Sequence, residues 1–135
     1  MSVRKRAASI IIRDGKLLVL HRQKPKSDYY ILPGGGVDLD ESFEEACIRE
    51  VKEETGLDAL GLQLVYIRHD EHTEEHYFVT RVPPDEPVLG GVEAERQSPD
   101  NIYTLEWVTA EQLALLNLTP AASQRFCVEL LKRSA

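Results

Sequence analysis

The chain has 135 residues, a formal net charge of −7 and 42% apolar residues. This apolar content supports a folded core, and the length predicts one domain over residues 1–135. The negative charge argues against sequence-independent binding to long nucleic acid, which needs a surface rich in Lys and Arg. No apolar run approaches the roughly 18 residues needed to cross a bilayer, and the first residues lack the apolar stretch of a secretory signal. We therefore expect a cytoplasmic protein without a membrane partner.

The first third of the chain predicts short strands followed by a glycine-rich break. The strands are expected over residues 7–13, 16–22 and 29–32. Asp14 and Gly15 separate the first two strands and are typical of a two-residue hairpin turn. Three consecutive glycines, Gly34–Gly36, follow the third strand. We expect them to break regular structure and to let the backbone approach another group closely.

The rest of the chain predicts one long helix, three strands and two C-terminal helices. The long helix runs from Ser42 to Thr55, with a capping box formed by Ser42 and Glu45 and a stop at Gly56. The elements after it are expected over residues 61–68, 76–82, 102–108, 109–115 and 120–132. Residues 83–100 form a loop long enough to suggest a function. This order predicts a mixed α/β domain with a helix packed against strands.

The helix over residues 42–55 carries carboxylates on the face that should be packed. At about 100° per residue, Glu50 and Glu54 fall within the apolar arc and Glu53 lies at its border. Charge repulsion, the helix dipole and desolvation all disfavour acids in these positions. A divalent cation would offset these costs, and hard cations such as Mg²⁺ prefer oxygen ligands. Ordinary ion pairing with Arg49 and Lys52 is the alternative, and it explains one surface pair but not three acids crowded towards an apolar face.

Residues 35–57 read G-G-V-D-L-D-E-S-F-E-E-A-C-I-R-E-V-K-E-E-T-G-L and resemble the Nudix box, G-x5-E-x7-R-E-U-x-E-E-x-G-U, in which U is a bulky aliphatic residue. All nine specified positions are filled, by Gly35, Glu41, Arg49, Glu50, Val51, Glu53, Glu54, Gly56 and Leu57. The stretch from Glu106 to Leu113 is also similar to that family. The resemblance implies a Nudix fold, an α/β architecture in which a mixed sheet is flanked by helices in an α/β/α sandwich.

The resemblance also implies a reaction, in which water attacks a phosphorus atom of a diphosphate linkage with the help of Mg²⁺ or Mn²⁺. The substrate class is a nucleoside diphosphate joined to another group. Carried over by position, the metal ligands are Glu50, Glu53 and Glu54. The carbonyl of Gly34 or Gly35 would complete the metal shell.

Other residues of the box have implied supporting or catalytic roles. Glu53 and Glu50 are the candidate bases that activate water. Arg49 would orient Glu50 through charge-assisted hydrogen bonds. Glu41 would brace the loop, and Gly56 would support the end of the helix.

Four residues outside the box are candidate substrate contacts. Arg22 matches a position that often contacts phosphate in relatives, with a plain surface arginine as the alternative. In the loop over residues 83–100, the resemblance favours Glu93 and Glu95 as additional acids. Tyr77 could stack on a base, and a place in the core is its alternative.

The sequence leaves several alternatives open for the substrate and the function. The substrate could be a nucleoside triphosphate, a nucleotide sugar, ADP-ribose or a dinucleoside polyphosphate. A second hypothesis is a non-catalytic nucleotide-binding or regulatory domain, which the complete set of box acids disfavours. An isomerase of prenyl diphosphates would need a further catalytic cysteine, and Cys47 lies inside the box helix. We expect Cys47 and Cys127 to be buried reduced thiols, and a homodimer is common in the family that the sequence resembles.

Overall fold

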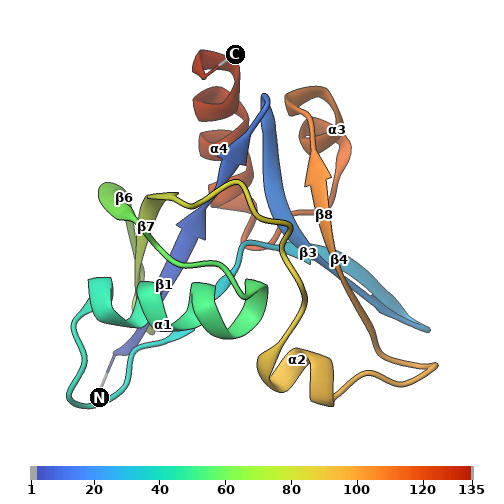
Figure 1. Ribbon diagram of the computed structural model, residues 1–135, viewed down its shortest axis with the longest axis horizontal. Helices are drawn as coiled ribbons and strands as arrows, with labels where there is room; N and C mark the ends of the chain where they lie inside the picture. The colour runs from blue at the N-terminus through green and yellow to red at the C-terminus, as the bar shows by residue number, and fades with distance from the viewer. Residues whose placement is uncertain (1–2, 135) are drawn as a thin grey trace.

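The computed structural model describes residues 3–134, apart from the side chains of Val92 and Glu93. In chain order its elements are β1 (Arg4–Ile10), β2 (Ile12–Arg13), β3 (Lys16–Lys24), β4 (Ser27–Ile31), β5 (Gly34–Gly36), α1 (Phe43–Thr55), β6 (Gly61–His69), β7 (Thr73–Arg81), α2 (Gly91–Glu95), β8 (Ile102–Val108), α3 (Ala110–Leu115) and α4 (Ala121–Arg133). Figure 1 shows α1 crossing in front of β1 and β7, and α4 rising beside β1 at the other end of the molecule. Within residues 3–134, no helix combines the length and apolar character needed to span a membrane.

The strands form two sheets of different character. The first sheet has the order β5-β1-β7-β6, with β1 parallel to β7 and the other pairs antiparallel. In the second sheet β3 pairs antiparallel with β2, β4 and β8. This arrangement confirms the expected α/β architecture of mixed strands flanked by helices, and it divides those strands between two sheets.

The first sheet separates two apolar cores. Because side chains alternate along a strand, Ala7 of β1 points to the core under α1, whereas Ala8 of β1 and Tyr77 of β7 point to the core under α4. Each core also contains one buried free cysteine, Cys47 under α1 and Cys127 under α4. The prediction of two buried reduced thiols is confirmed.

The first predicted strand is divided between the two sheets. β1 ends at Ile10 in the first sheet, and β2 begins at Ile12 in the second. The expected hairpin turn is present, with φ of 52° at Asp14 and 74° at Gly15, but the prediction of one strand over residues 7–13 is wrong. The residues on both sides of this change are apolar, so the sequence shows one continuous apolar run and gives no sign that the chain passes from one sheet to the other.

The glycine run forms a short strand, which corrects the expectation of irregular structure. β5 pairs antiparallel with β1 at the edge of the first sheet. The expected close approach of backbone does occur, because a Cβ on Gly34 would overlap the carbonyl oxygen of Ala7. The absence of side chains therefore lets β5 lie directly against β1 and places its amides beside α1.

His21 lies buried on β3 between carboxylates from the two neighbouring strands. Its Nδ1 is 2.7 Å from Glu106 Oε2, and its Nε2 is 2.7 Å from Asp28 Oδ1. Burial alone would lower the pKa of His21, but the hydrogen bonds to Asp28 and Glu106 raise it above its usual value. A raised folded-state pKa stabilises the fold fully below the unfolded-state pKa, and that contribution disappears as the pH rises through the folded-state pKa.

We therefore expect His21→Gln to reduce the free energy of unfolding by about 1 kcal/mol at about pH 6, and by clearly less at about pH 9. Urea unfolding at a series of pH values would measure the difference. His72→Gln is the control, because the His72 side chain is 73% exposed and its loss should change stability little at any pH. An equal cost of His21→Gln across the whole range would contradict the prediction.

Candidate active site

Helix α1 has well-defined ends that fix the positions of its acids. At its start, the Ser42 hydroxyl accepts the N–H of Glu45 at 3.0 Å, and the Glu45 carboxylate accepts the N–H of Ser42 at 2.9 Å. This is the capping box that the sequence predicts. At its end, Gly56 adopts φ 73° and donates its N–H to Lys52 O. A left-handed residue stops the helix here, and glycine takes that conformation without steric cost.

Arg49 is the centre of a hydrogen-bond network that joins α1 to the loop before it. Its Nε and Nη2 donate to the two carboxylate oxygens of Glu41 at 2.6 and 2.9 Å. Nη2 also donates to Gly36 O at 3.0 Å, and Nη1 donates to Glu50 Oε1 at 2.8 Å. The hydrogen bonds from Arg49 lower the pKa of Glu41 to about 2. The hydrogen bonds to Glu41 raise the pKa of Arg49 above its already high value, so both groups stay charged at neutral pH.

Glu50 lies against the backbone of β5, and Gly35 makes room for it. The Glu50 side chain is only 15% exposed. A Cβ on Gly35 would lie 2.6 Å from Glu50 Oε1 and 2.7 Å from its Cδ, distances at which the carboxylate would have to move. The glycine is therefore needed for Glu50 to keep its place beside Arg49.

We expect Gly35→Ala to reduce activity by about tenfold or more, because it displaces Glu50, which the resemblance implies is a metal ligand or base. Initial hydrolysis rates and melting temperatures of the variant would be measured together. Gly36→Ala is the matched control, since a Cβ there would meet no atom closer than Lys5 O at 4.0 Å. Equal activity of the two variants would show that the position of Glu50 is unimportant.

Glu54 is almost completely buried, as its place in the apolar arc of the helix predicted. It is 2% exposed, and its Oε1 accepts the N–H of Gly34 at 2.8 Å. Burial of a carboxylate is costly unless hydrogen bonds and charge compensate it. The N–H of Gly34 supplies part of that compensation and holds the Glu54 side chain at the junction between α1 and β5.

Glu53 is the least restrained acid of the three. Its side chain is 50% exposed, and its Oε2 lies 3.4 Å from Arg49 Nη1. Within the described residues, no three His, Cys, Asp or Glu side chains form a cluster already arranged to hold a metal ion. Arg49 Nη1 instead contacts both Glu50 and Glu53, at 2.8 and 3.4 Å. The chemistry of the donors still fits a hard divalent cation, because all three side chains are carboxylates and Glu50 and Glu54 both lie against β5.

The loop over residues 83–100 docks on the end of α1, a contact that the sequence did not predict. The N–H of Val88 donates to Thr55 O at 2.9 Å, and the N–H of Gly90 donates to Glu54 O at 3.1 Å. A Cβ on Gly90 would lie 2.5 Å from Glu53 O, so only glycine allows this approach. The pair Gly90-Gly91 is the sequence feature that could have indicated this close approach of the loop to α1. Helix α2 follows directly and lies beside the C-terminal end of α1 (Figure 1).

The two candidate substrate contacts of that loop, Glu93 and Glu95, both lie in α2. Glu93 lies in α2, but its side chain is outside the described part of the structure. Glu95 ends α2 and is exposed. The docking of residues 88–90 brings this helix close to the acids of α1, which keeps both glutamates as candidates.

Arg22 and Tyr77 lie in other parts of the fold. The Arg22 guanidinium packs against the rings of Tyr29 and Tyr103, at 5.8 and 5.0 Å from their centroids, and its Nη1 donates to the Tyr29 hydroxyl at 2.7 Å. Tyr77 is 0% exposed, and its hydroxyl donates to Glu75 Oε1 at 2.7 Å. A ring without an exposed face cannot stack on a base, so the core role replaces the stacking role for Tyr77.

Comparison with known proteins gives this geometry a family. A family model described as the NUDIX domain matches residues 3–127. An ADP-ribose pyrophosphatase of Methanocaldococcus jannaschii is 49% identical over 49 residues, which are 36% of this chain and 29% of that protein. A CTP pyrophosphohydrolase of Escherichia coli K12 is 43% identical over 54 residues, 38% of this chain and 40% of that protein. The crystal structure of a MutT NUDIX hydrolase from Burkholderia pseudomallei is similar at a TM-score of 0.70 and 26% identity, covering 96% of this chain and 98% of that one.

The chain belongs to the Nudix family, because the family model covers nearly all of it. The Nudix fold expected from the box is also confirmed by the solved structures. The matched stretches span only 29% and 40% of these two curated relatives, so the chain covers less than half of either. The family model over residues 3–127 carries the assignment to the family, and the local matches to these relatives do not by themselves give this chain an activity or a substrate.

Proposed function

We propose that this protein hydrolyses the diphosphate linkage of a small nucleotide-type compound, using Mg²⁺ or Mn²⁺ held by Glu50, Glu53 and Glu54. The observation that carries the proposal is the buried carboxylate of Glu54, which is 2% exposed and hydrogen-bonded to the N–H of Gly34. Three acids within five residues near the C-terminal end of a helix repel one another and oppose its dipole. A bound cation relieves both effects, and we expect the carbonyl oxygen of Gly34 or Gly35 to complete its ligand shell.

The residues of the site have distinct parts in this reaction. A divalent cation supplies charge neutralisation at the phosphoryl oxygens and makes water more acidic. Glu53 is half exposed and only weakly restrained, so it is free to accept a proton from the attacking water. Glu50 is held by Arg49 at 2.8 Å and is the second candidate base. Arg49 positions Glu50, and Glu41 in turn fixes Arg49.

The names of two relatives support a substrate class. One curated relative is an ADP-ribose pyrophosphatase and another is a CTP pyrophosphohydrolase. Both named compounds contain a nucleoside attached to linked phosphates. We therefore infer a substrate in which a nucleoside diphosphate is joined to another group, with Arg22, Glu93 and Glu95 as candidate contacts.

A substrate screen tests the proposed function. Purified protein would be incubated with nucleoside triphosphates, nucleotide sugars, ADP-ribose and dinucleoside polyphosphates, each with Mg²⁺, Mn²⁺ or EDTA, and products would be separated by chromatography. We expect turnover of at least one class with metal and none with EDTA. A compound that raises the melting temperature but is never cleaved would instead support a non-catalytic nucleotide-binding domain.

A further inference from the structure

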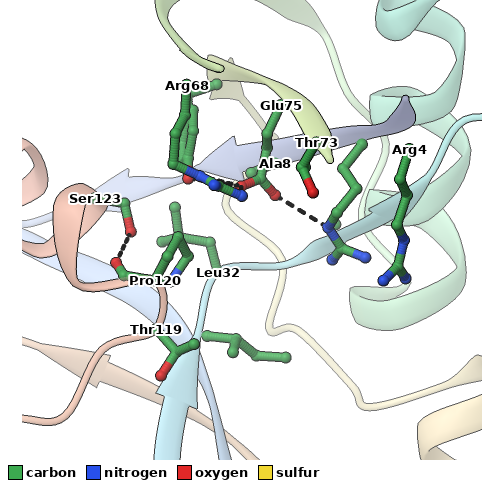
Figure 2. A pocket seen from close by; sticks show the side chains of 13 residues that line it. Arg4, Ala8, Leu32, Arg68, Thr73, Glu75, Thr119, Pro120 and Ser123 are labelled. Carbon is green, nitrogen blue, oxygen red and sulfur yellow. Dashed lines mark hydrogen bonds and ion pairs between the residues drawn. The ribbon is translucent and has the colours of Figure 1, made fainter. Parts of the chain in front are cut away.

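A cavity of about 250 Å³ lies on the face of the first sheet opposite α1 (Figure 2). Its walls come from β1, β5, β6 and β7 of that sheet, from the end of β4 and from the start of α4. Strand alternation directs Arg4, Arg6 and Ala8 of β1 to this face, whereas Lys5 points to the α1 face. The cavity therefore collects the cationic side chains at the start of β1.

Glu75 lies at the centre of this cavity wall, and its hydrogen-bonding capacity is largely used. It is 5% exposed. Its Oε2 accepts from Arg6 Nε at 3.2 Å, while its Oε1 accepts from Arg68 Nη2 at 3.1 Å and from the Tyr77 hydroxyl at 2.7 Å. In Figure 2, Glu75 lies between Arg68 on one side and Arg4 on the other. The carboxylate therefore links Arg6, Arg68 and Tyr77 within the wall. Because its oxygens already accept these hydrogen bonds, it is poorly placed to accept hydrogen bonds from a ligand.

The cavity has unused hydrogen-bond donors and an excess of positive charge. Three guanidinium groups line it, from Arg4, Arg6 and Arg68, against the one carboxylate of Glu75. Within the described residues, Arg4 has no side-chain hydrogen bond or ion pair, and Arg6 uses only its Nε. This local charge is opposite to the net charge of −7 of the whole chain. Guanidinium forks of this kind suit the geometry of phosphate oxygens.

The lining of the cavity does not suit a nucleobase. Base recognition commonly uses stacking on an aromatic face, but Tyr77, the aromatic residue of the described lining, is 0% exposed. The accessible polar side chains of the lining are the exposed Arg4 and Thr119 and the half-buried Arg6, Arg68 and Thr73, and the arginines are the charged ones among them. An occupant that accepts hydrogen bonds and carries negative charge therefore matches the cavity better than a flat ring does.

Gly34 connects this cavity to the acids of α1. It lines the cavity, and its N–H also donates to Glu54 Oε1 at 2.8 Å. Gly34 belongs to an edge strand made of glycines, so no side chain there separates the α1 face of the first sheet from the cavity face. A diphosphate beside Glu54 would therefore lie next to the edge of the cavity that Arg4 and Arg6 also line.

We propose that Arg4 and Arg6 bind a phosphate group that the substrate carries in addition to the diphosphate linkage that is cleaved. This inference rests on the proposed function and narrows its substrate class. The additional phosphate is either an ester on the group joined to the nucleoside diphosphate or the terminal phosphate of a longer chain. Both sources present the same chemistry to the two guanidinium groups.

Two matched pairs of compounds test the proposal and separate the two sources. NADP⁺ and NAD⁺ differ by one phosphate ester, and ATP and ADP differ by one terminal phosphate. We expect the phosphate-richer compound of at least one pair to have a kcat/KM about tenfold higher, mainly through a lower KM. Arg4→Gln should remove most of that preference. Lys5→Gln, which removes the same charge from the opposite face of β1, should retain it.

Arg6→Gln is a second variant. Because it also removes the contact with Glu75, it can affect folding, and the proposal is therefore judged by Arg4→Gln. Equal kcat/KM within both pairs, or an unchanged preference in Arg4→Gln, would overturn the proposal while hydrolysis itself upheld the proposed function. If none of the compounds is cleaved, the proposed function fails for them. Calorimetric titration of the same four compounds in EDTA then tests the phosphate site by binding alone. The proposal requires the unmodified protein to bind NADP⁺ more tightly than NAD⁺, or ATP more tightly than ADP. It also requires Arg4→Gln to bind the phosphate-richer compound more weakly than the unmodified protein does.

Discussion

Replacement of Glu54 by Gln should reduce metal-dependent hydrolysis by about 100- to 1,000-fold, because it removes one charged ligand of the proposed cation. The fold should survive, since the Gln side chain retains an oxygen that can accept the N–H of Gly34, now 2.8 Å from Glu54 Oε1. The loss of a buried negative charge should even raise the melting temperature when metal is absent. Activity and stability would then change in opposite directions, as expected of a residue that is retained for function.

Glu44→Gln is the matched control for this variant. Glu44 lies in the first turn of the same helix and is exposed, so its replacement removes the same charge away from the acids. Rates would be measured as a function of Mg²⁺ concentration, and Mn²⁺ binding would be followed by calorimetry without substrate. Full turnover and unchanged Mn²⁺ binding in Glu54→Gln would rule out the assigned metal site.

The sequence predicted the features of α1 that depend on neighbouring residues. The capping box of Ser42 and Glu45 and the stop at Gly56 are signals within one or two turns, and both give the observed ends of the helix. Helical periodicity likewise placed Glu54 inside, where it is 2% exposed. It could not tell how far Glu53 would turn outward, because that depends on the contact with Arg49 and on the loop that covers the helix end.

The sequence could not predict contacts that depend on which strands pair. The ion pair of Arg6 and Glu75 joins residues 69 positions apart, and it exists because β1 and β7 lie side by side in parallel. The docking of Gly90 on Glu54 similarly requires the path of the whole loop. Such contacts follow from tertiary packing, so no local pattern of Arg, Glu or Gly reveals them. The cavity beside Gly34 could be found only from the structure for the same reason.

Arg49→Ala should abolish most activity and lower the melting temperature at neutral pH by about 5 °C or more. Arg49 makes the two-pronged pair with Glu41 and the contact with Glu50, and each of those side chains is only 15% exposed. Without the guanidinium, two crowded carboxylates lose their shared cation, and Gly36 O loses its donor at 3.0 Å. Arg49→Lys keeps the charge but not the planar fork, so we expect an intermediate loss of stability. Differential scanning calorimetry and initial rates would measure both effects.

The pH dependence of this loss separates the ion pair from simple loss of packing. The folded-state pKa of Glu41 is lowered to about 2 by the Arg49 hydrogen bonds, so the pair stabilises the fold fully above the unfolded-state pKa of about 4.3. That contribution is lost as the pH falls from there toward the folded-state pKa. The melting temperatures of the unmodified protein and Arg49→Ala should therefore converge in acid. A constant difference down to about pH 2.5 would mean that Arg49 stabilises the loop through its apolar stem instead. In that case Arg49→Lys would stabilise the protein almost as well as arginine does, and the orientation of Glu50 would need another cause.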